Sequence, residues 1–152
     1  MYRIITKIEI NVPTEIVWDV LTDFDKYQDW NTQLYFISGF PELGQQLELK
    51  LEPMGHKGYH FKPTLHAMKP QKLLAWKGNV IAGGVFSVEH RFRLEKTELG
   101  STILMNEEIC KGLASPVMQM LPITQNTAAS LDWLNEEIND RAMAIASKKM
   151  AS

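Results

Sequence analysis

VFSVEHRFRLEKTELGSTILMNEEICKG, residues 85–112, is the stretch of the sequence that decides the fold. In its first part, apolar and charged side chains alternate, which is typical of a strand with one buried face. A turn signal, TELGS (97–101), separates this run from a second strand-like run that ends at Gly112. We therefore predict two antiparallel strands joined by a tight turn. One face would carry Phe86, Val88, His90, Phe92 and Leu94, and the other Glu89, Arg91 and Arg93.

The register of this hairpin places one polar pair on the apolar face. With the turn centred on Leu99, His90 lies opposite Glu108, and directly opposed Cβ atoms are about 4.5–5.5 Å apart. We expect a hydrogen-bonded pair, and three roles remain open for it. It could be a buried polar pair that holds the register, an anchor for a ligand carbonyl or hydroxyl, or a catalytic couple in which Glu108 orients His90. A slip of one residue would bring Glu107 inward instead.

The flanking sequence predicts more strands of the same kind. Alternating or short apolar runs occupy residues 2–12, 33–38, 45–52, 58–68 and 73–80, with turn signals between them. Pro63 interrupts the fourth of these runs and indicates an edge position or a bulge. An antiparallel sheet of about seven strands follows from this pattern.

Helical spacing appears in two places. Pro13 opens a helix directly after the first strand, and a second short helix carries Phe24, Tyr27 and Trp30 on roughly one side. From Ile123 a long helix begins. We predict an α+β fold over residues 1–152 as one domain, with a curved sheet wrapped around the C-terminal helix and two short helices after the first strand.

Composition excludes several functions. Sixteen basic and eighteen acidic residues give a net charge of −2, which does not suit a nucleic-acid binder. No apolar run is long enough to span a membrane, and the N-terminus reads as a strand and not as a signal peptide. A single cysteine, Cys110, fits a reducing compartment. We expect a cytoplasmic protein.

Several segments together resemble the START-like (SRPBCC) superfamily of helix-grip, or Bet v 1-like, proteins, and within it the polyketide cyclase/dehydrase-like branch. They keep the order and approximate spacing of that family over nearly the whole chain. The segments are VPTEIVWDVLTDFDKYQDWN (12–31), FKP (61–63), LAWKG (74–78), VFSVEHRFRLE (85–95), Glu108 with Gly112, and WLNEEINDRA (133–142). The resemblance implies a deep cavity between sheet and helix that takes small, mostly hydrophobic ligands.

We expect such a cavity to be lined by broad rings, flexible methionines and a few polar groups. The alternative is that the same rings form an ordinary core. Gly83 and Gly84 lie in a loop that could act as a gate. Besides His90 and Glu108, the expected lining comprises Trp30, Phe61, Trp76, Phe86, Phe92, Met118, Met120 and Leu121. Phe24 and Tyr27 are expected to seal the core instead.

Two other kinds of site are disfavoured. His56, His60 and His66 share one strand face, but four residues of strand span about 13 Å, too far for a single metal ion. Cys110 could be a nucleophile only with a base beside it, so a passive buried thiol is the simpler interpretation.

The predicted function is the binding of a small hydrophobic molecule, such as a lipid, a polyketide or an aromatic metabolite, by a monomer or homodimer without a cofactor. One alternative is a metal-independent enzyme of the cyclase, aromatase or dehydrase type that uses His90 and Glu108. Another is a protein-interaction module with a vestigial cavity, for which a fully packed interior would be the sign.

Overall fold

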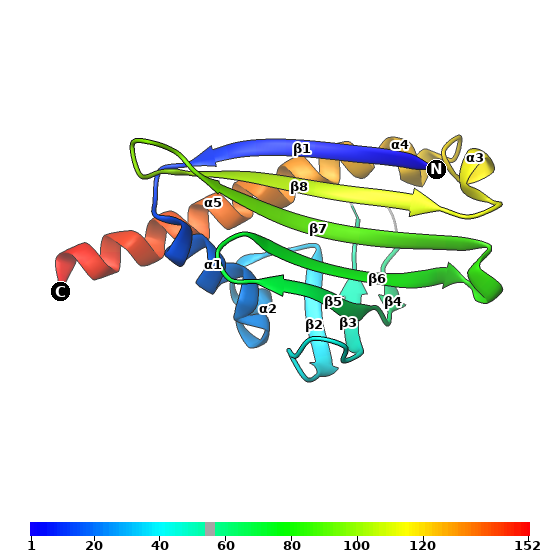
Figure 1. Ribbon diagram of the computed structural model, residues 1–152, viewed down its shortest axis with the longest axis horizontal. Coiled ribbons are helices and arrows are strands. Elements are labelled where there is room, and N and C mark those ends of the chain that lie inside the picture. Colours follow the sequence, from blue (N-terminus) through cyan, green and yellow to red (C-terminus); the bar gives the residue numbers. More distant parts are fainter. Residues whose placement is uncertain (54–56) are drawn as a thin grey trace.

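The computed structural model describes residues 1–53 and 57–152 and has the α+β architecture that the sequence predicts. A strand and short helices come first, then a run of strands, then helices (Figure 1). In chain order the elements are β1 (Tyr2–Ile10), α1 (Thr14–Thr22), η1 (Phe24–Lys26), α2 (Tyr27–Trp30), β2 (Leu34–Gly39), β3 (Leu47–Leu51), β4 (Tyr59–Phe61), β5 (Thr64–Lys69), β6 (Leu73–Ile81), η2 (Ala82–Gly84), β7 (Phe86–Lys96), β8 (Thr102–Lys111), α3 (Ser115–Met118), α4 (Pro122–Gln125) and α5 (Thr127–Ala151).

The strands form two antiparallel sheets. The larger has the strand order β1-β8-β7-β6-β5, and the smaller has the order β2-β3-β4. A bridge between Gln46 and Thr64 and a hydrogen bond from the Leu47 amide to the Pro63 carbonyl, at 2.8 Å, connect them. The strands of the smaller sheet run steeply across the direction of those in the larger one (Figure 1).

Among the described residues there are eight strands, where the sequence predicts about seven. The difference lies in residues 58–68, which form β4 and β5 instead of one interrupted strand. Pro63 falls between them, and because proline has no backbone N–H it cannot continue a hydrogen-bonded ladder. The chain passes at this point from the smaller sheet to the larger one.

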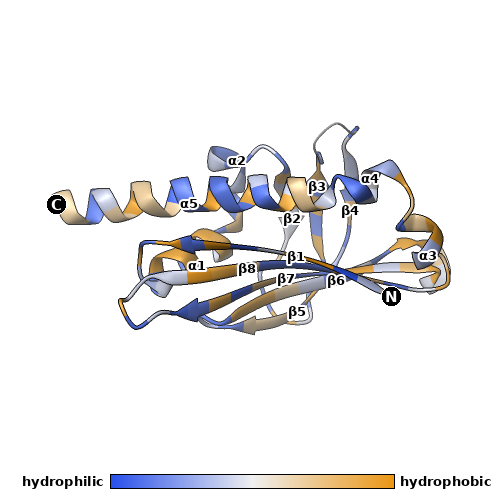
Figure 2. Ribbon diagram, turned by 90° about the horizontal axis from the view of Figure 1, so that it is seen from above, coloured by the Kyte–Doolittle hydropathy of each residue, from blue (hydrophilic) through white to orange (hydrophobic). Residues whose placement is uncertain are grey.

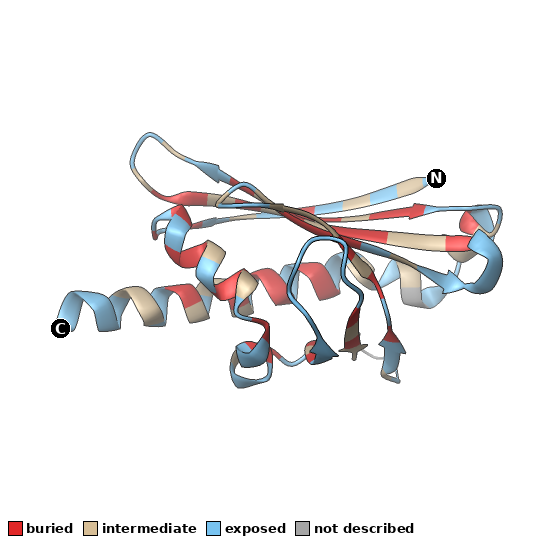
Figure 3. Ribbon diagram, turned by 60° about the horizontal axis from the view of Figure 1, so that its bottom comes forward, coloured by how far each residue is buried: buried red, intermediate tan, exposed pale blue. Residues whose placement is uncertain are grey.

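Helix α5 runs along one face of the larger sheet (Figure 2). Its buried side chains recur at helical spacing and include Leu131, Leu134, Ile138 and Ala142. The C-terminal end of α5 projects past the sheet (Figure 1), and its side chains there are largely exposed (Figure 3). Its N-terminal half therefore covers the concave face, as predicted for a helix-grip fold.

The short helices after β1 close one end of this arrangement. Phe24 and Tyr27 are almost fully buried, with their ring centroids 5.3 Å apart in an edge-to-face pair. Phe24 also packs on Phe36 of β2 at 5.6 Å. The Tyr27 hydroxyl donates to the Leu21 carbonyl, which satisfies its one buried polar group. Both rings seal the core, as the sequence indicates.

Candidate functional site

The predicted register of the central hairpin is confirmed. His90 on β7 lies opposite Glu108 on β8, and on its other side it lies opposite Trp76 on β6. Ile4 of β1 completes this row across four strands. Glu107, one residue away, faces the other side of the sheet, where Arg3 and Arg93 bind it at 2.6 and 2.5 Å.

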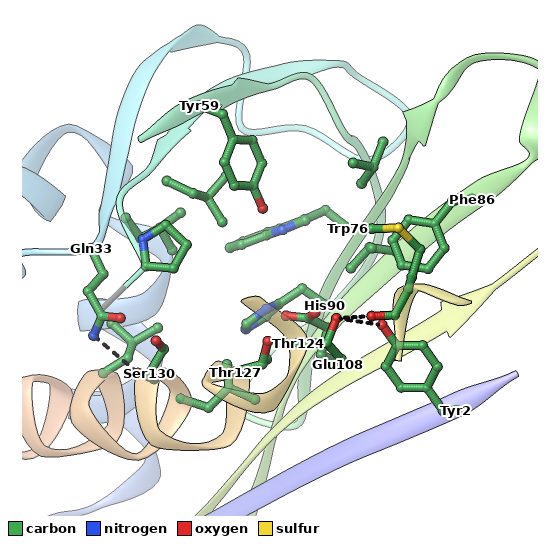
Figure 4. A pocket seen from close by; sticks show the side chains of 18 residues that line it. Tyr2, Gln33, Tyr59, Trp76, Phe86, His90, Glu108, Thr124, Thr127 and Ser130 are labelled. Carbon is green, nitrogen blue, oxygen red and sulfur yellow. Dashed lines mark hydrogen bonds between the residues drawn. The ribbon is translucent and has the colours of Figure 1, made fainter. Parts of the chain in front are cut away.

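A cavity of about 270 Å³ lies between the two sheets and the start of α5. Figure 4 shows Trp76 and His90 on its sheet side and residues of α5 on the opposite side. Most of the described wall is apolar or aromatic, and no lysine or arginine lies among its described residues. The lining residues are Tyr2, Gln33, Leu34, Leu51, Pro53, Tyr59, Trp76, Val80, Phe86, Val88, His90, Glu108, Met118, Thr124, Thr127, Ser130, Leu131 and Leu134.

The His90 imidazole packs between neighbouring aromatic rings in this wall. It stacks on the Trp76 indole with centroids 5.4 Å apart and planes 18° apart, and it contacts the Phe92 ring at 4.5 Å. Burial lowers the pKa of His90 to about 4, only partly offset by its contact with Asn106. The ring is therefore neutral at neutral pH, and a neutral imidazole has one N–H donor and one acceptor nitrogen.

Glu108 has the opposite perturbation. Burial raises the pKa of its carboxyl group to about 7, so a large fraction is protonated at neutral pH. The expected hydrogen bond between His90 and Glu108 is not formed, although the two residues share the row. Instead the Cys110 thiol donates to Glu108 Oε1 at 3.7 Å. Between about pH 4 and pH 7, two neutral groups therefore face the cavity side by side, with no ion pair between them.

Cys110 is fully buried on β8, on the same strand face as Glu108. Burial raises the pKa of this thiol to about 12. Because the thiolate is the nucleophilic form, such a pKa favours the interpretation of a passive thiol.

Polar contacts lie at two ends of the cavity. At one end, Tyr2 Oη lies 3.5 Å from Thr124 Oγ1, which donates to the Met118 carbonyl at 2.6 Å (Figure 4). At the other end, Gln33 Nε2 donates to the Ser130 carbonyl at 3.1 Å. These contacts tie β1 to the α3–α4 segment and the loop before β2 to α5.

Of the predicted lining residues, five lie in the wall. They are Trp76, Phe86, His90, Glu108 and Met118. Four lie elsewhere. Phe61 fits over Gly78 of β6, where a Cβ would approach its ring to 3.1 Å. Phe92 lies in the next row of the sheet and contacts Trp76 edge-on at 5.6 Å, behind the wall.

Trp30 and Leu121 also lie outside the cavity wall. Trp30 turns back onto Tyr27, with ring centroids 5.5 Å apart, and so belongs with the short helices that close one end of the fold. Leu121 immediately precedes Pro122 and is 39% exposed, and its neighbour Met120 is 77% exposed. Both are directed to the surface because the chain turns between the short helices α3 and α4.

Several lining residues are not predicted from the sequence. Tyr2 shares strand parity with Ile4, so extending the first apolar face by one step would have included it. Tyr59 shares strand parity with Phe61, so one step outward from that expected lining residue would have included it. Gln33, Thr124 and Thr127 are polar residues of loops and helix starts, for which the sequence carries no periodic signal.

The histidines outside the cavity have separate partners. His60 Nδ1 lies 3.2 Å from Glu48 on the smaller sheet, and His66 Nε2 lies 3.0 Å from Glu89 on the larger one. His56 is outside the described residues. In the part of the chain that the structure describes, no group of three metal-binding side chains is found. No helix there is long and apolar enough to cross a membrane.

A curved antiparallel sheet around a long helix, with a cavity between them, defines a START-like helix-grip protein. The family described as "Polyketide cyclase / dehydrase and lipid transport" matches residues 1–136. The chain belongs to this family. No curated protein matches the sequence significantly.

Solved structures show the same fold at low sequence identity. A Nitrosomonas europaea protein, NE0264, has a TM-score of 0.72 at 12% identity, with 95% of this chain and 96% of that one covered. A START superfamily protein of Mycobacterium smegmatis has a TM-score of 0.70 at 16% identity, covering 95% and 99%. StfQ, a di-domain aromatase/cyclase of the steffimycin biosynthetic pathway, has a TM-score of 0.67 at 10% identity, covering 99% of this chain and 52% of StfQ.

Proposed function

We propose that the protein reversibly binds a small, mostly apolar ring compound in the cavity between its sheets and α5. The observation that carries this proposal is the cavity wall itself, which combines the large rings of Trp76 and Phe86 with a few polar groups. This is the usual composition of a small-molecule site. The family, whose description includes lipid transport, supports the same class of function.

The cavity volume narrows the range of ligands. About 270 Å³ is slightly below the roughly 300 Å³ at which ordinary ligand sites begin, and nearly twice the roughly 150 Å³ that accommodates benzene. A molecule of one or two rings fits, whereas a whole membrane lipid exceeds the space. Among lipids, polyketides and aromatic metabolites, we therefore favour the last.

Native mass spectrometry of the protein purified from its own host tests this proposal. We expect a reproducible adduct of small mass that Val88→Phe removes, because the added ring occupies the cavity. Val117→Phe is the matched control, since it adds the same mass at a side chain that is 65% exposed and outside the cavity wall. An apo mass in every preparation, or an adduct that Val88→Phe retains, would contradict the proposal.

A second candidate is a metal-independent enzyme, and the pair of neutral groups favours it. A carboxyl group with a pKa of about 7, as at Glu108, suits proton transfer near neutral pH. The similarity of fold to the aromatase/cyclase StfQ is consistent with this candidate. Glu108→Gln separates the two: an enzyme would lose turnover but keep its affinity for product, whereas a carrier would change only in affinity.

The third candidate, an interaction module with a vestigial cavity, is less favoured. Its sign would be an interior filled by side chains, and the space enclosed by Trp76, Phe86 and Leu134 is not filled in this way.

A further inference from the structure

Three buried polar side chains lie beside the cavity wall without being part of it. They come from three elements: Thr6 from β1, Asn106 from β8 and Asn135 from α5. Their exposed fractions are 8%, 0% and 1%. Burying polar groups is costly unless they are hydrogen-bonded, so their arrangement needs a reason.

These side chains form a chain of hydrogen bonds with one direction. Asn106 Nδ2 donates to Asn135 Oδ1 at 3.0 Å, and Asn135 Nδ2 donates to Thr6 Oγ1 at 2.9 Å. Since the amide nitrogen of Asn106 is used toward α5, its carbonyl oxygen, Oδ1, is the atom left for the neighbouring row of the sheet. That oxygen is buried and has no hydrogen bond of good geometry.

A complementary atom is left over on His90. Its Nε2 is also buried without a partner of good geometry. The interaction between His90 and Asn106 favours the protonated imidazole, which is the effect of an acceptor that faces an N–H group. An unpaired acceptor, Asn106 Oδ1, and an unpaired ring nitrogen, His90 Nε2, therefore lie on adjacent rows of the sheet, and the two complement each other when Nε2 carries the proton.

We propose that the chain Thr6–Asn135–Asn106 holds His90 as the Nε2–H tautomer, so that the cavity presents the Nδ1 lone pair to an uncharged aromatic ligand bearing a hydroxyl group. Thr6, Asn106 and Asn135 are positioning residues in this arrangement, because they act through His90. The inference rests on the proposed binding function and specifies its ligand class.

The electrostatics of the wall select the charge of the ligand. The described lining residues include no lysine or arginine, and Glu108 is the only carboxyl group among them. An anionic ligand would bury a second acid group without a counter-ion, which is costly. A hydroxyl group, in contrast, donates a hydrogen bond to the imidazole lone pair. The aromatic ring of the ligand that carries this hydroxyl then stacks in the space beside Trp76.

The tautomer can be measured without any ligand. Nitrogen-15 long-range correlation NMR of the full chain distinguishes the Nε2–H, Nδ1–H and protonated forms of His90, with His90→Gln providing the assignment. We expect a single Nε2–H form at pH 7. A predominant Nδ1–H form, a fast mixture of both, or a protonated ring would overturn the proposal.

Changes at Asn135 test the origin of the tautomer. Asn135→Leu removes the acceptor for Asn106, which can then turn its NH₂ group toward the imidazole, so we expect the Nδ1–H form to appear. Asn135→Asp is the matched control, because its oxygens still accept from Asn106 and the Nε2–H form should persist. A wild-type spectrum in folded Asn135→Leu would show that the chain does not hold the tautomer, and would overturn that part of the proposal.

Three probes of one shape test the ligand class: naphthalene, 2-naphthol and 2-naphthoate, each titrated into the protein by isothermal titration calorimetry. Because 2-naphthol gains one hydrogen bond to His90, we expect it to bind about fivefold or more tightly than naphthalene, and we expect 2-naphthoate to bind most weakly. Equal affinity for naphthalene and 2-naphthol, or tightest binding of 2-naphthoate, overturns this inference but leaves the binding function standing. If none of the three binds, while Val88→Phe and wild type behave alike, both proposals fail.

Discussion

At the scale of single residues, His90 and Glu108 are perturbed in opposite directions by the same cause. Burial penalises the charged form of each, so the histidine pKa falls to about 4 and the carboxyl pKa rises to about 7. Both groups are therefore neutral together over a wide pH range. A cavity wall of this kind remains polar without carrying charge.

The two perturbations have opposite effects on stability as the pH changes. Between about pH 4.5 and 6.5, His90 is protonated only in the unfolded chain, so it makes stability rise with pH. Over the same range Glu108 is protonated only in the folded chain, so it makes stability fall with pH. Each contributes a slope of up to about 1.4 kcal/mol per pH unit, and in the wild type the two nearly cancel.

Single substitutions should reveal each slope. Relative to the wild type, Glu108→Gln should gain stability as the pH rises from about 5 to 7, by up to about 3 kcal/mol, and keep this gain above pH 7. At low pH His90→Gln should be more stable than the wild type, and this difference in unfolding free energy should disappear as the pH rises from about 4 to 6.5. Urea denaturation at a series of pH values measures both. Parallel stability curves for wild type and Glu108→Gln would show that this carboxyl group ionises normally.

The pairing of His90 with Glu108 could be predicted because only one short turn separates their strands. Once Leu99 is placed at its centre, counting outward decides every pair. The rings of Trp30 and Phe61 could not be placed in this way. Their directions depend on contacts with Tyr27 and with the bare backbone of Gly78, and spacing along the chain does not report such contacts.

At the scale of elements, the β6–β7 hairpin is tied to the connection between β8 and α3. The Ala114 amide donates to the Val85 carbonyl at 3.0 Å, close to Gly112. Gly112 has a φ of +115°, and a Cβ there would lie 2.3 Å from the Val85 oxygen. The two segments can approach this closely only because residue 112 has no side chain.

Gly112→Ala should therefore lower the free energy of unfolding by more than the strain of a positive φ alone would. Gly100 is a matched control: its φ is +86°, and a Cβ there would meet nothing within 4 Å. We expect Gly100→Ala to lose about 1–2 kcal/mol of unfolding free energy from the positive φ alone, and Gly112→Ala to lose clearly more. Urea denaturation of the two variants measures the difference. Equal losses would mean that the close approach of Gly112 to Val85 is not maintained in solution.

Helix α5 offers a similar comparison between cavity wall and core. Leu134 lines the cavity, whereas Ile138, one turn later, is fully buried outside it. Truncation to alanine should cost about 2 kcal/mol at Leu134, which already borders empty space, and about 3–4 kcal/mol at Ile138. Only Leu134→Ala should increase the affinity for a three-ring analogue such as 2-hydroxyanthracene relative to 2-naphthol. The opposite pattern would place the ligand away from α5.

Some of these elements can be predicted from the sequence and others cannot. A long helix over a sheet follows from the change of period after residue 122, and the structure confirms it, although α5 begins at Thr127 and the predicted first turn at Ile123 belongs to the separate short helix α4. The separation of β4 from β5 could not be settled, because a proline in a strand fits an edge, a bulge or a break equally well. The structure shows a break because Leu47 of β3 bonds to the Pro63 carbonyl, a contact between distant segments.

At the scale of the whole molecule, the cavity is the place where the two sheets and α5 meet around an unfilled space. Leu34 and Leu51 come from the smaller sheet, Trp76 and Val88 from the larger one, and Leu131 from α5. A bound ligand would contact all three bodies at once. Contacts that form only when the ligand is bound stabilise each of the two sheets and α5 against local opening.

Hydrogen–deuterium exchange with and without saturating 2-naphthol tests this consequence. Local opening of the small β2–β4 sheet should become rarer by on the order of tenfold or more when the ligand bridges it to the larger sheet and α5. Residues 143–151 should be unaffected, because that end of α5 projects past the sheet (Figure 1). Val88→Phe is the control, since its filled cavity should abolish the ligand effect. Protection confined to the larger sheet would mean that the ligand does not reach Leu34 and Leu51, and that the cavity does not act as a single site.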